Sequence, residues 1–310
     1  MKRLPNSERR QFFKIVATTA VSGLFWPAIS RAKPSSVITK PIPSSGEKIP
    51  VVGLGSSITF NVGDDPVARD GCAEVIRNFF TAGGKLIDSS PMYGSSQEVI
   101  GYGLQKLNKT GEVFSADKVW ISSPEEGRTQ MEASRQYWNV KNFSLMQVHN
   151  LVSWEEHLET LFAMKQASEI RYVGITTSHG RRHGEFEKVM SKHPLDFIQL
   201  SYNIIDREVE QRLLPLAKER GIAVIVNRPY QRGDLIDWAK FNPLPPWAKD
   251  IDCDNWAQFL LKFIVSHPAV TCAIPATRRV DHVLENMSAA TGRMPNEATR
   301  RRMIDYIENL

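Results

Sequence analysis

Short runs of apolar and β-branched residues alternate along the chain with longer segments in which apolar residues recur every three or four positions. Eight such runs occur, at residues 51–55, 85–88, 113–119, 145–149, 171–175, 196–201, 222–226 and 271–274. Helical periodicity separates most of them, for example at residues 154–167, 208–220 and 255–266. Nearly continuous apolar strands that alternate with helices are typical of a parallel sheet buried on both faces.

The number of these units favours a closed barrel over an open sheet. Eight strand–helix units within about 230 residues fit an α/β fold of the (β/α)8 TIM-barrel type. An open dinucleotide-binding sheet would carry a GxGxxG turn after its first strand, but the segment that begins Gly53-Leu54-Gly55 lacks the third glycine. We therefore expect one barrel domain at residues 48–310, preceded by a Pro/Ser-rich linker at residues 33–47.

The first 32 residues have the layout of an export signal. A charged start precedes a short, weakly apolar run and a small-residue end at Ala32. The pair Arg9-Arg10, followed by Gln11 and two phenylalanines, resembles a twin-arginine (Tat) signal peptide. The apolar run is short for a membrane span. The resemblance implies export by the twin-arginine machinery to the periplasm, cleavage after Ala32 and no membrane span afterwards.

Other interpretations of this segment stay open. It is also compatible with an amphipathic first helix that contains a chance arginine pair, or with an uncleaved anchor. The protein would then be cytoplasmic or tethered to a membrane.

Composition and charge narrow the class of protein further. The chain has 310 residues, 42% of them hydrophobic, with a formal net charge of +5. Residues 1–32 contain six basic residues and one acidic residue, so the remainder carries equal numbers of both. The positive charge thus belongs to the predicted signal and does not indicate a nucleic-acid surface. Three cysteines are too few for a disulfide framework, although pairing of Cys253 with Cys272 is left open.

One long segment, residues 228–254, has no clear periodicity and is rich in Trp and Pro. It follows the seventh predicted strand, so it would lie at the carboxyl-terminal rim, where barrel active sites form. A loop of this length is either functional or a surface excursion packed by its own side chains. The sequence favours neither.

Four ionisable residues follow three successive predicted strands. Asp88 ends the second strand, Lys118 the third and His149 the fourth, while Tyr93 lies shortly after Asp88. Each has an ordinary structural explanation, such as a cap, a solvated terminus, a core histidine or a packed turn. Together, at the rim where strand ends converge, they favour a catalytic site.

The segments that carry these residues resemble the signatures of the aldo-keto reductases. The matching segments are residues 87–98, 114–119, 145–150, 171–177, 197–203 and 274–279, followed by His282, Glu285 and Asn286. The resemblance covers residues 48–292. It implies that Tyr93 donates a proton to the substrate carbonyl, that Lys118 lowers the pKa of this tyrosine, that Asp88 pairs with Lys118, and that His149 orients the carbonyl.

Elementary chemistry agrees with these roles. Hydride addition to a carbonyl carbon builds negative charge on oxygen, which must be protonated or held by donors. A free tyrosine titrates near pH 10, so an adjacent ammonium is needed to favour its phenolate. A buried lysine needs a carboxylate partner to stay charged.

The same resemblance implies a nicotinamide cofactor, with NADP(H) favoured and NAD(H) also compatible, and no metal. Its binding residues would be Thr176, Thr177, Gln199, Asn227, Thr277, Arg278, Arg279, Glu285 and Asn286. The arginines suit the 2′-phosphate of NADP at a helix start. Asn227 is a departure, because many relatives place there an aromatic residue that stacks on the nicotinamide. Either Tyr230 or Trp120 replaces it, or the ring is held without stacking.

We therefore predict an NADP(H)-dependent oxidoreductase that interconverts a small aldehyde or ketone and its alcohol. Two alternatives remain. One is an exported barrel that binds NADP with little or no turnover, which the departure at Asn227 leaves open. The other is a metal-dependent barrel hydrolase with His179 and His183 as ligands, which the absence of an HxH pair disfavours.

Overall fold

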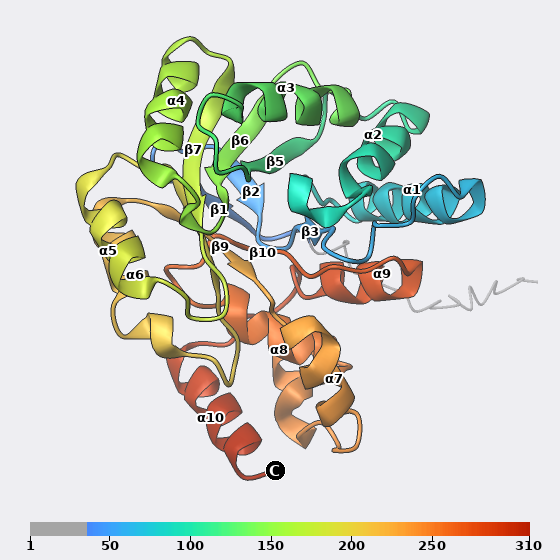
Figure 1. The fold of residues 1–310 in the computed structure, drawn as a ribbon. Helices are drawn as coiled ribbons and strands as arrows, with labels where there is room; N and C mark the ends of the chain where they lie inside the picture. The colour runs from blue at the N-terminus through green and yellow to red at the C-terminus, as the bar shows by residue number, and fades with distance from the viewer. Residues whose placement is uncertain (1–35) are drawn as a thin grey trace, which may run out of the picture. The chain divides into compact units, whose positions relative to one another are not determined.

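The computed structural model describes residues 36–310, which form a closed parallel barrel (Figure 1). Its strands are β3 (Leu54–Gly55), β4 (Leu86–Asp88), β5 (Phe114–Val119), β6 (Phe143–Val148), β7 (Ile170–Thr176), β8 (Phe197–Ser201), β9 (Ala223–Asn227) and β10 (Cys272–Ala273). They are hydrogen-bonded in chain order. Bridges from Val52 to Ala273 and from Gly55 to Ala276 join the first strand to the last. The predicted barrel is confirmed.

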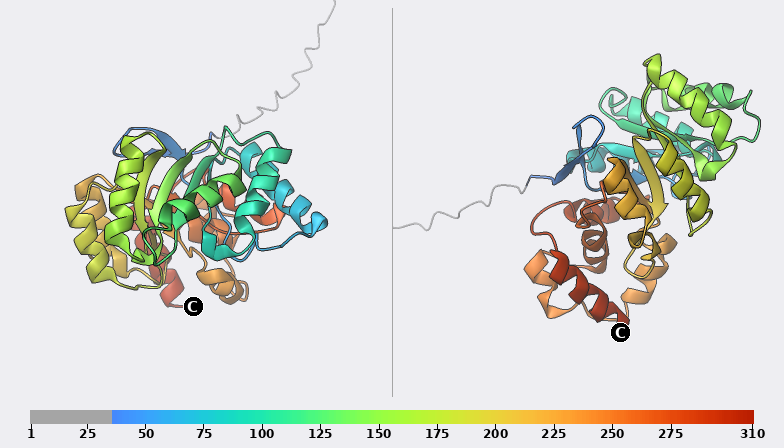
Figure 2. Two further views of the ribbon diagram at one scale, coloured as in Figure 1. Left: turned by 45° about the horizontal axis from the view of Figure 1, so that its top comes forward. Right: turned by 90° about the vertical axis from the view of Figure 1, so that its left-hand side faces the viewer.

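Helices cover the outside of this barrel (Figure 2). They are α1 (Pro66–Thr81), α2 (Ser96–Lys106), α3 (Gly127–Trp138), α4 (Trp154–Gln166), α5 (His183–Lys192), α6 (Leu213–Arg220), α7 (Asp234–Ala239), α8 (Trp256–Val265), α9 (Val280–Ser288) and α10 (Glu297–Glu308). Side-chain caps set several of their starts. The Asp65 carboxylate accepts hydrogen bonds from two backbone N–H groups of α1, and Asn255 caps α8 in the same way.

The helix expected at residues 208–220 is interrupted. A short 3₁₀ turn, Glu208–Glu210, precedes α6, and Arg212 between them has non-helical dihedral angles (φ −141°, ψ −49°). The apolar periodicity of this segment does not register the break, because buried residues lie on both sides of it, at Val209 and Leu213.

A β-hairpin closes the amino-terminal end of the barrel. Strands β1 (Thr39–Pro41) and β2 (Lys48–Pro50) pair antiparallel. Ile42 and Ile49 of this hairpin are buried with barrel-interior residues such as Phe114 and Leu145. Much of the segment 33–47, predicted as a linker, is therefore part of the folded unit. Its Pro and Ser residues suggested a linker, but its buried isoleucine anchors it to the core. The predicted export signal at residues 1–32 lies outside the described residues.

The segment 228–254 is more regular than expected. It contains two 3₁₀ turns, Gln231–Gly233 and Pro246–Ile251, on either side of α7. Its second half is packed by aromatic contacts, with the rings of Trp247 and Phe259 5.7 Å apart. Its first half lines the cavity described below. The first half of the segment thus borders the cavity, and the second half packs against α8.

Cys72, Cys253 and Cys272 are buried free thiols, so the pairing left open for the latter two is not formed. Among residues 36–310, no helix has the length and apolar character needed to cross a membrane.

Candidate active site

Strand alternation and register bring the polar residues together at the carboxyl end of the barrel. Successive strand residues point to opposite faces, so Lys118 faces the interior while Asp117 faces the surrounding helices. Lys118 pairs with Gln147 on the neighbouring strand β6. Gly174 continues this layer on β7, where a Cβ atom would lie 2.8 Å from the Phe197 carbonyl oxygen. The absence of a side chain at Gly174 therefore leaves room for the larger polar side chains of this layer.

Lys118 and Asp88 form a buried ion pair. The Lys118 ammonium donates to Asp88 Oδ1 at 2.6 Å and to the Ser89 carbonyl oxygen at 2.7 Å. Gln199 donates to the other carboxylate oxygen of Asp88 at 2.9 Å. Burial is the largest single effect and lowers the lysine pKa, but the interactions with Asp88, Tyr93 and Asp117 together raise this pKa above its ordinary value. The lysine is therefore charged at neutral pH.

Tyr93 ends a 3₁₀ turn, Pro91–Tyr93, that Ser90 caps through its side chain. The Lys118 ammonium lies 5.3 Å from the centre of the Tyr93 ring. Burial raises the pKa of Tyr93, and the charge of Lys118 works in the opposite direction without cancelling it. Lys118 thus brings the pKa of Tyr93 below the value that burial alone would give, but not below its ordinary value. Tyr93 keeps its proton at neutral pH, as a proton donor must.

His149 follows β6 and lies against Tyr93. The two rings meet edge to face, with centroids 5.9 Å apart, and the indole ring of Trp120 lies 6.3 Å from the imidazole. The Nδ1 atom of His149 is 2.8 Å from the hydroxyl of Ser90. Burial, followed by the charge of Lys118, lowers the pKa of His149 to about 3. The imidazole is therefore neutral and suited to donating a hydrogen bond rather than a proton.

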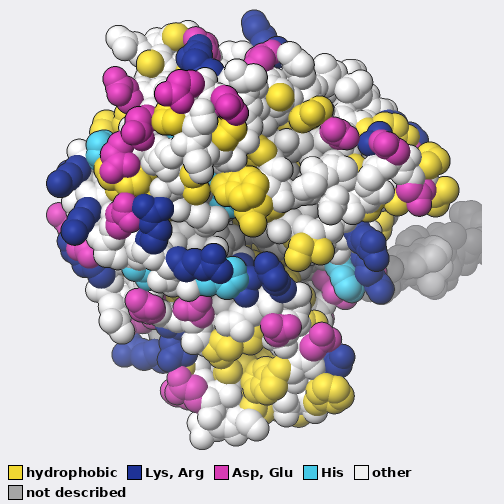
Figure 3. All heavy atoms as spheres, in the orientation of Figure 1, with side chains coloured by type: hydrophobic (Ala, Val, Ile, Leu, Met, Phe, Trp, Pro, Cys, Tyr) yellow, Lys and Arg dark blue, Asp and Glu magenta, His cyan; other side chains and the backbone are white. Residues whose placement is uncertain are grey.

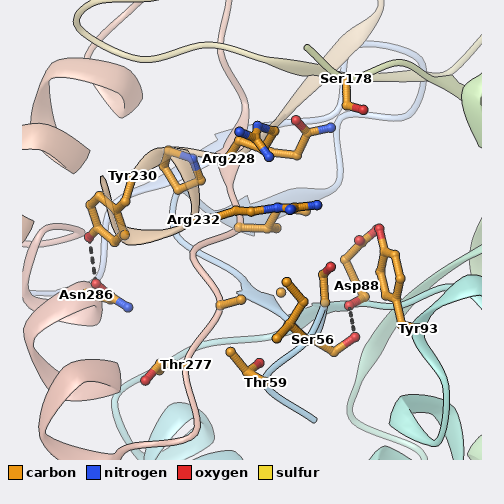
Figure 4. Close-up of a pocket in the computed structure, with 18 of the residues that line it drawn as sticks. Ser56, Thr59, Asp88, Tyr93, Ser178, Arg228, Tyr230, Arg232, Thr277 and Asn286 are labelled. Atoms are coloured by element: carbon orange, nitrogen blue, oxygen red, sulfur yellow. Dashed lines mark hydrogen bonds between the residues drawn. The ribbon is translucent and has the colours of Figure 1, made fainter. Parts of the chain in front are cut away.

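A cavity of about 690 Å³ opens above this cluster. Loops that follow the barrel strands surround it, and basic side chains gather around a hollow on this face (Figure 3). Tyr93 and Asp88 lie at one side, and Tyr230, Asn286 and Thr277 at the other (Figure 4). A cavity of this size with polar groups at both ends suits an elongated ligand.

The predicted cofactor residues divide into two groups. Gln199, Asn227, Thr277, Glu285 and Asn286 line the cavity. The other four residues do not line it, namely Thr176, Thr177, Arg278 and Arg279. Both threonines are buried, and both arginines are exposed.

The contacts of the second group explain their positions. Thr176 accepts a hydrogen bond from the Asn150 N–H, and Thr177 donates to the Arg181 carbonyl oxygen. Arg279, the residue directly before α9, forms an ion pair with Asp281. Arg278 forms none within residues 36–310.

Asn227 is held by its neighbours. Its amide donates to the Thr177 carbonyl oxygen at 3.0 Å and accepts from the Ser201 hydroxyl at 2.7 Å. Neither aromatic residue considered as its replacement lies in its place. Tyr230 donates to Asn286 at 2.7 Å, across the cavity from Tyr93 (Figure 4), and Trp120 adjoins His149. The end of β9 thus offers an amide where many relatives offer a ring.

Several residues of this site are not among those predicted from the sequence. Ser90 contacts His149, and Gln147 lies 3.4 Å from Asp88 with its own Oε1 buried and without a partner. A period of two along the fourth strand would have placed Gln147 beside His149 on the interior face. Arg181, Arg228 and Arg232 also line the cavity, but no spacing rule marks them.

The two histidines of the alternative metal site have separate partners. His179 Nδ1 lies 2.9 Å from the Ser178 hydroxyl, and His183 Nδ1 lies 3.3 Å from a carboxylate oxygen of Glu208. Within residues 36–310, no cluster of three or more His, Cys, Asp or Glu side chains has a metal-binding arrangement.

Comparisons with known proteins agree with this geometry. An uncharacterized oxidoreductase of Schizosaccharomyces pombe is 26% identical over 247 residues, which cover 76% of this chain and 78% of the relative. An NADH-specific methylglyoxal reductase of Escherichia coli is 27% identical over 223 residues, covering 59% and 64%.

Solved structures share the fold. An aldo-keto reductase from Bacillus halodurans in its holo form has a TM-score of 0.72 at 20% identity, covering 88% of this chain and 96% of that one. An aldo/keto reductase from Klebsiella pneumoniae in complex with NADP and acetate has a TM-score of 0.68 at 20% identity, covering 84% and 92%. The model of the aldo/keto reductase family matches residues 51–301, and the chain therefore belongs to this family of oxidoreductases.

Proposed function

We propose that the protein reduces an aldehyde or ketone to its alcohol with NADPH as the hydride donor, or catalyses the reverse reaction. The observation that carries this proposal is the buried Asp88–Lys118 pair below Tyr93, with a neutral His149 at its side. This arrangement supplies one proton and one hydrogen bond to a single oxygen atom. Reduction of a carbonyl requires both at that atom.

The residues present fit a nicotinamide dinucleotide. The cavity extends from Tyr93 to Thr277, which precedes α9, and to Asn286 in the last turn of α9. The side-chain amides of Gln199 and Asn227 border it beside Asp88 and Tyr93. Arg278 has no carboxylate partner within residues 36–310 and lies just before α9, where a phosphate is favoured. When bound, NADPH supplies the hydride.

The protein residues then manage the proton. Tyr93 gives its phenolic proton to the carbonyl oxygen as negative charge develops there. Lys118 stabilises the resulting phenolate, and Asp88 keeps Lys118 protonated in its buried position. The Ser90 hydroxyl is buried and accepts from the Met92 N–H. Among residues 36–310 its own proton has no acceptor other than His149 Nδ1, so the hydroxyl donates to this nitrogen. His149 therefore keeps its proton on Nε2, from which it can donate to the carbonyl oxygen.

The test compares the wild type with Tyr93→Phe. NADPH oxidation is followed with a panel of small aldehydes and ketones that includes methylglyoxal, because the Escherichia coli relative is named for this compound. We expect Tyr93→Phe to lose about a hundredfold or more in kcat and to keep the wild-type Kd for NADPH. Wild-type protein that binds NADPH but reduces no member of the panel would support the alternative of a binding barrel.

We further propose that residues 1–32 direct export to the periplasm by the twin-arginine route. The arginine pair, the weakly apolar run and the small residues before Lys33 support this proposal. This route carries folded proteins, so the barrel would acquire its cofactor before export. Replacing Arg9 and Arg10 by lysine should retain the protein in the cytoplasm on fractionation. Unchanged distribution of the double variant would contradict the proposal.

A further inference from the structure

Three arginines line the cavity without a carboxylate partner. Arg228 and Arg232 extend into it (Figure 4), and Arg181 borders it from the loop after β7. Within residues 36–310, most arginines form an ion pair, as Arg182 does with Glu185 at 2.7 Å, but none of these three does so. Beyond residue 32 the chain contains equal numbers of basic and acidic residues. The cluster is thus a local feature, not the result of a generally basic surface.

The three arginines line one cavity. Burial, followed by the charges of Arg228, Arg181 and Arg232, lowers the pKa of His179, so all three arginines act on the same imidazole. Carboxylates lie in the surroundings, since Asp234 and Asp206 act on Arg228 and Asp237 and Glu285 line the cavity, but none pairs directly with these guanidinium groups. Like charges repel, and guanidinium groups that share a cavity without a direct partner favour an anionic ligand.

The loop that carries Arg181 is fixed to the catalytic end of the barrel. The buried Thr177 hydroxyl donates to the Arg181 carbonyl oxygen at 2.5 Å, and the His179 N–H donates to Ser201 at 3.2 Å. The guanidinium of the next residue, Arg182, donates to the carbonyl oxygens of Asn150 and Leu151 at 3.0 and 2.7 Å. Both belong to the turn that begins at His149. Arg181 is therefore held beside the turn that carries His149.

The cofactor accounts for only part of this positive charge. This step rests on the proposed function, which assigns the Tyr93 end of the cavity to the reacting carbonyl and the Arg278 end to the 2′-phosphate. A diphosphate group joins the two halves of NADP, and the loop after β9 offers it Arg228 and Arg232. Arg181 lies on a different loop, which Arg182 ties to the turn of His149, so its charge is left for the substrate.

We propose that the substrate is a carbonyl compound that carries a carboxylate, which Arg181 binds while the carbonyl oxygen meets Tyr93 and His149. The two oxygens of a carboxylate match the paired N–H donors of one guanidinium. This contact fixes one end of the substrate and restricts which carbonyl group reaches Tyr93. Arg181 is accordingly a specificity-determining residue with no part in the proton transfer.

The experiment uses three aldehydes that carry a carboxylate, namely succinic semialdehyde, glyoxylate and 4-formylbenzoate. Each is compared with its uncharged methyl ester. The ratio of kcat/KM for acid over ester is measured for the wild type, Arg181→Ala and Arg181→Lys. Arg220→Ala serves as a matched control, because Arg220 ends α6 and also lacks an ion pair within residues 36–310, yet does not line the cavity. Using a ratio removes differences in the general activity of the variants.

For at least one pair, we expect the wild type to prefer the acid by about tenfold or more, since hydrogen bonds to charged groups are worth this much. Arg181→Ala should lose the preference mainly through KM for the acid, with the Kd for NADPH unchanged. Arg181→Lys should retain part of the preference, and Arg220→Ala all of it. An equal ratio in the wild type and Arg181→Ala for every pair would overturn the proposal.

Calorimetry of the same compounds with NADP⁺-loaded protein gives a readout that requires no turnover. Acids that bind no more tightly than their esters, or that bind Arg181→Ala as well as the wild type, would also overturn the proposal. Failure of the proposed function looks different, because wild-type protein would then oxidise NADPH with none of these aldehydes, whether acid or ester. In that case the acids are titrated into the protein without cofactor, and the same comparison with Arg181→Ala decides.

Discussion

The ammonium of Lys118 lies 2.6 Å from Oδ1 of Asp88, and the two side chains are 0% and 3% exposed. They come from neighbouring strands, β5 and β4, whose parallel register places Ala116 opposite Asp88. Lys118 is two residues further along and faces the same interior layer. A buried charge is tolerated only with a partner, so Asp88 holds Lys118 in its charged form.

Replacing Asp88 by Asn should therefore disable Lys118 rather than remove it. Burial lowers the pKa of the lysine, and Asp88 is the first of the groups that oppose this effect. Without Asp88 the lysine pKa falls, and an uncharged amine no longer stabilises the Tyr93 phenolate. We expect kcat to fall by about a hundredfold or more with the Kd for NADPH nearly unchanged. Steady-state kinetics and fluorescence titration of NADPH check the two parts.

Stability provides the control for this variant. Breaking a buried pair typically costs about 3–5 kcal/mol, because one charge is left without a partner. The double variant Asp88→Asn, Lys118→Met removes both charges and should regain part of this loss in urea unfolding. If Lys118→Met lowers the stability of Asp88→Asn by as much as it lowers that of the wild type, the two residues are not coupled.

His149 should not titrate in the physiological range. Burial and the charge of Lys118 lower its pKa to about 3, so the imidazole stays neutral from pH 5 to pH 9. We expect the pH profile of kcat/KM to lack an inflection near 6.5 in this range. An inflection that disappears in His149→Gln would contradict this assignment.

Ser90→Ala tests the tautomer of the same histidine. Without the Ser90 hydroxyl, Nδ1 loses its partner at 2.8 Å, and the proton is no longer confined to Nε2. We expect kcat to fall by about threefold to tenfold, the range for one hydrogen bond. Nitrogen NMR of the labelled imidazole should show a mixture of tautomers in the variant and one tautomer in the wild type.

The barrel and the four central residues of the site could be predicted because they depend on local patterns. Each strand is an apolar run, and Asp88, Lys118 and His149 end three of these runs. The arginine cluster could not be predicted in this way. Arg181 and Arg228 are far apart in sequence and line one cavity only when the loops after β7 and β9 are in place. The hairpin was missed for a similar reason, because Ile42 is buried only against the completed barrel.

Asp117 lies on the outer face of β5 and is completely buried. It accepts hydrogen bonds at 2.7 Å from the Gln97 side chain and from the Lys118 N–H. Burial nevertheless raises its pKa from 3.8 to about 7, since these donors and the charge of Lys118 offset the effect only in part. Between about pH 4 and pH 7, the folded state therefore still holds the Asp117 proton, whereas the unfolded state has released it.

The sign of the pH effect follows from this difference. With the folded pKa above the unfolded one, the contribution of Asp117 to stability is lost as pH rises from about 4 to about 7, and is constant above. In Asp117→Asn the amide cannot ionise, and rotation of the Gln97 amide restores its hydrogen bond. Relative to the wild type, this variant should gain about 2–3 kcal/mol between pH 5 and pH 8 in urea unfolding. A difference that does not change with pH would show that Asp117 is ionised throughout.

Arg278 and Arg279 are adjacent in sequence but differ in charge balance. Arg279 is bound to Asp281, whereas Arg278 has no such partner within residues 36–310 and lies beside the start of α9. A 2′-phosphate at this position would meet the free guanidinium and the helix start together. Arg278→Ala should therefore weaken the binding of NADPH by about tenfold and leave the Kd for NADH within about twofold, because NADH lacks this phosphate.

Arg279→Ala is the matched control and should change the Kd for NADPH much less, since its charge is already neutralised by Asp281. Equal weakening of both cofactors in Arg278→Ala would mean that this arginine supports the fold of the loop and does not select NADP.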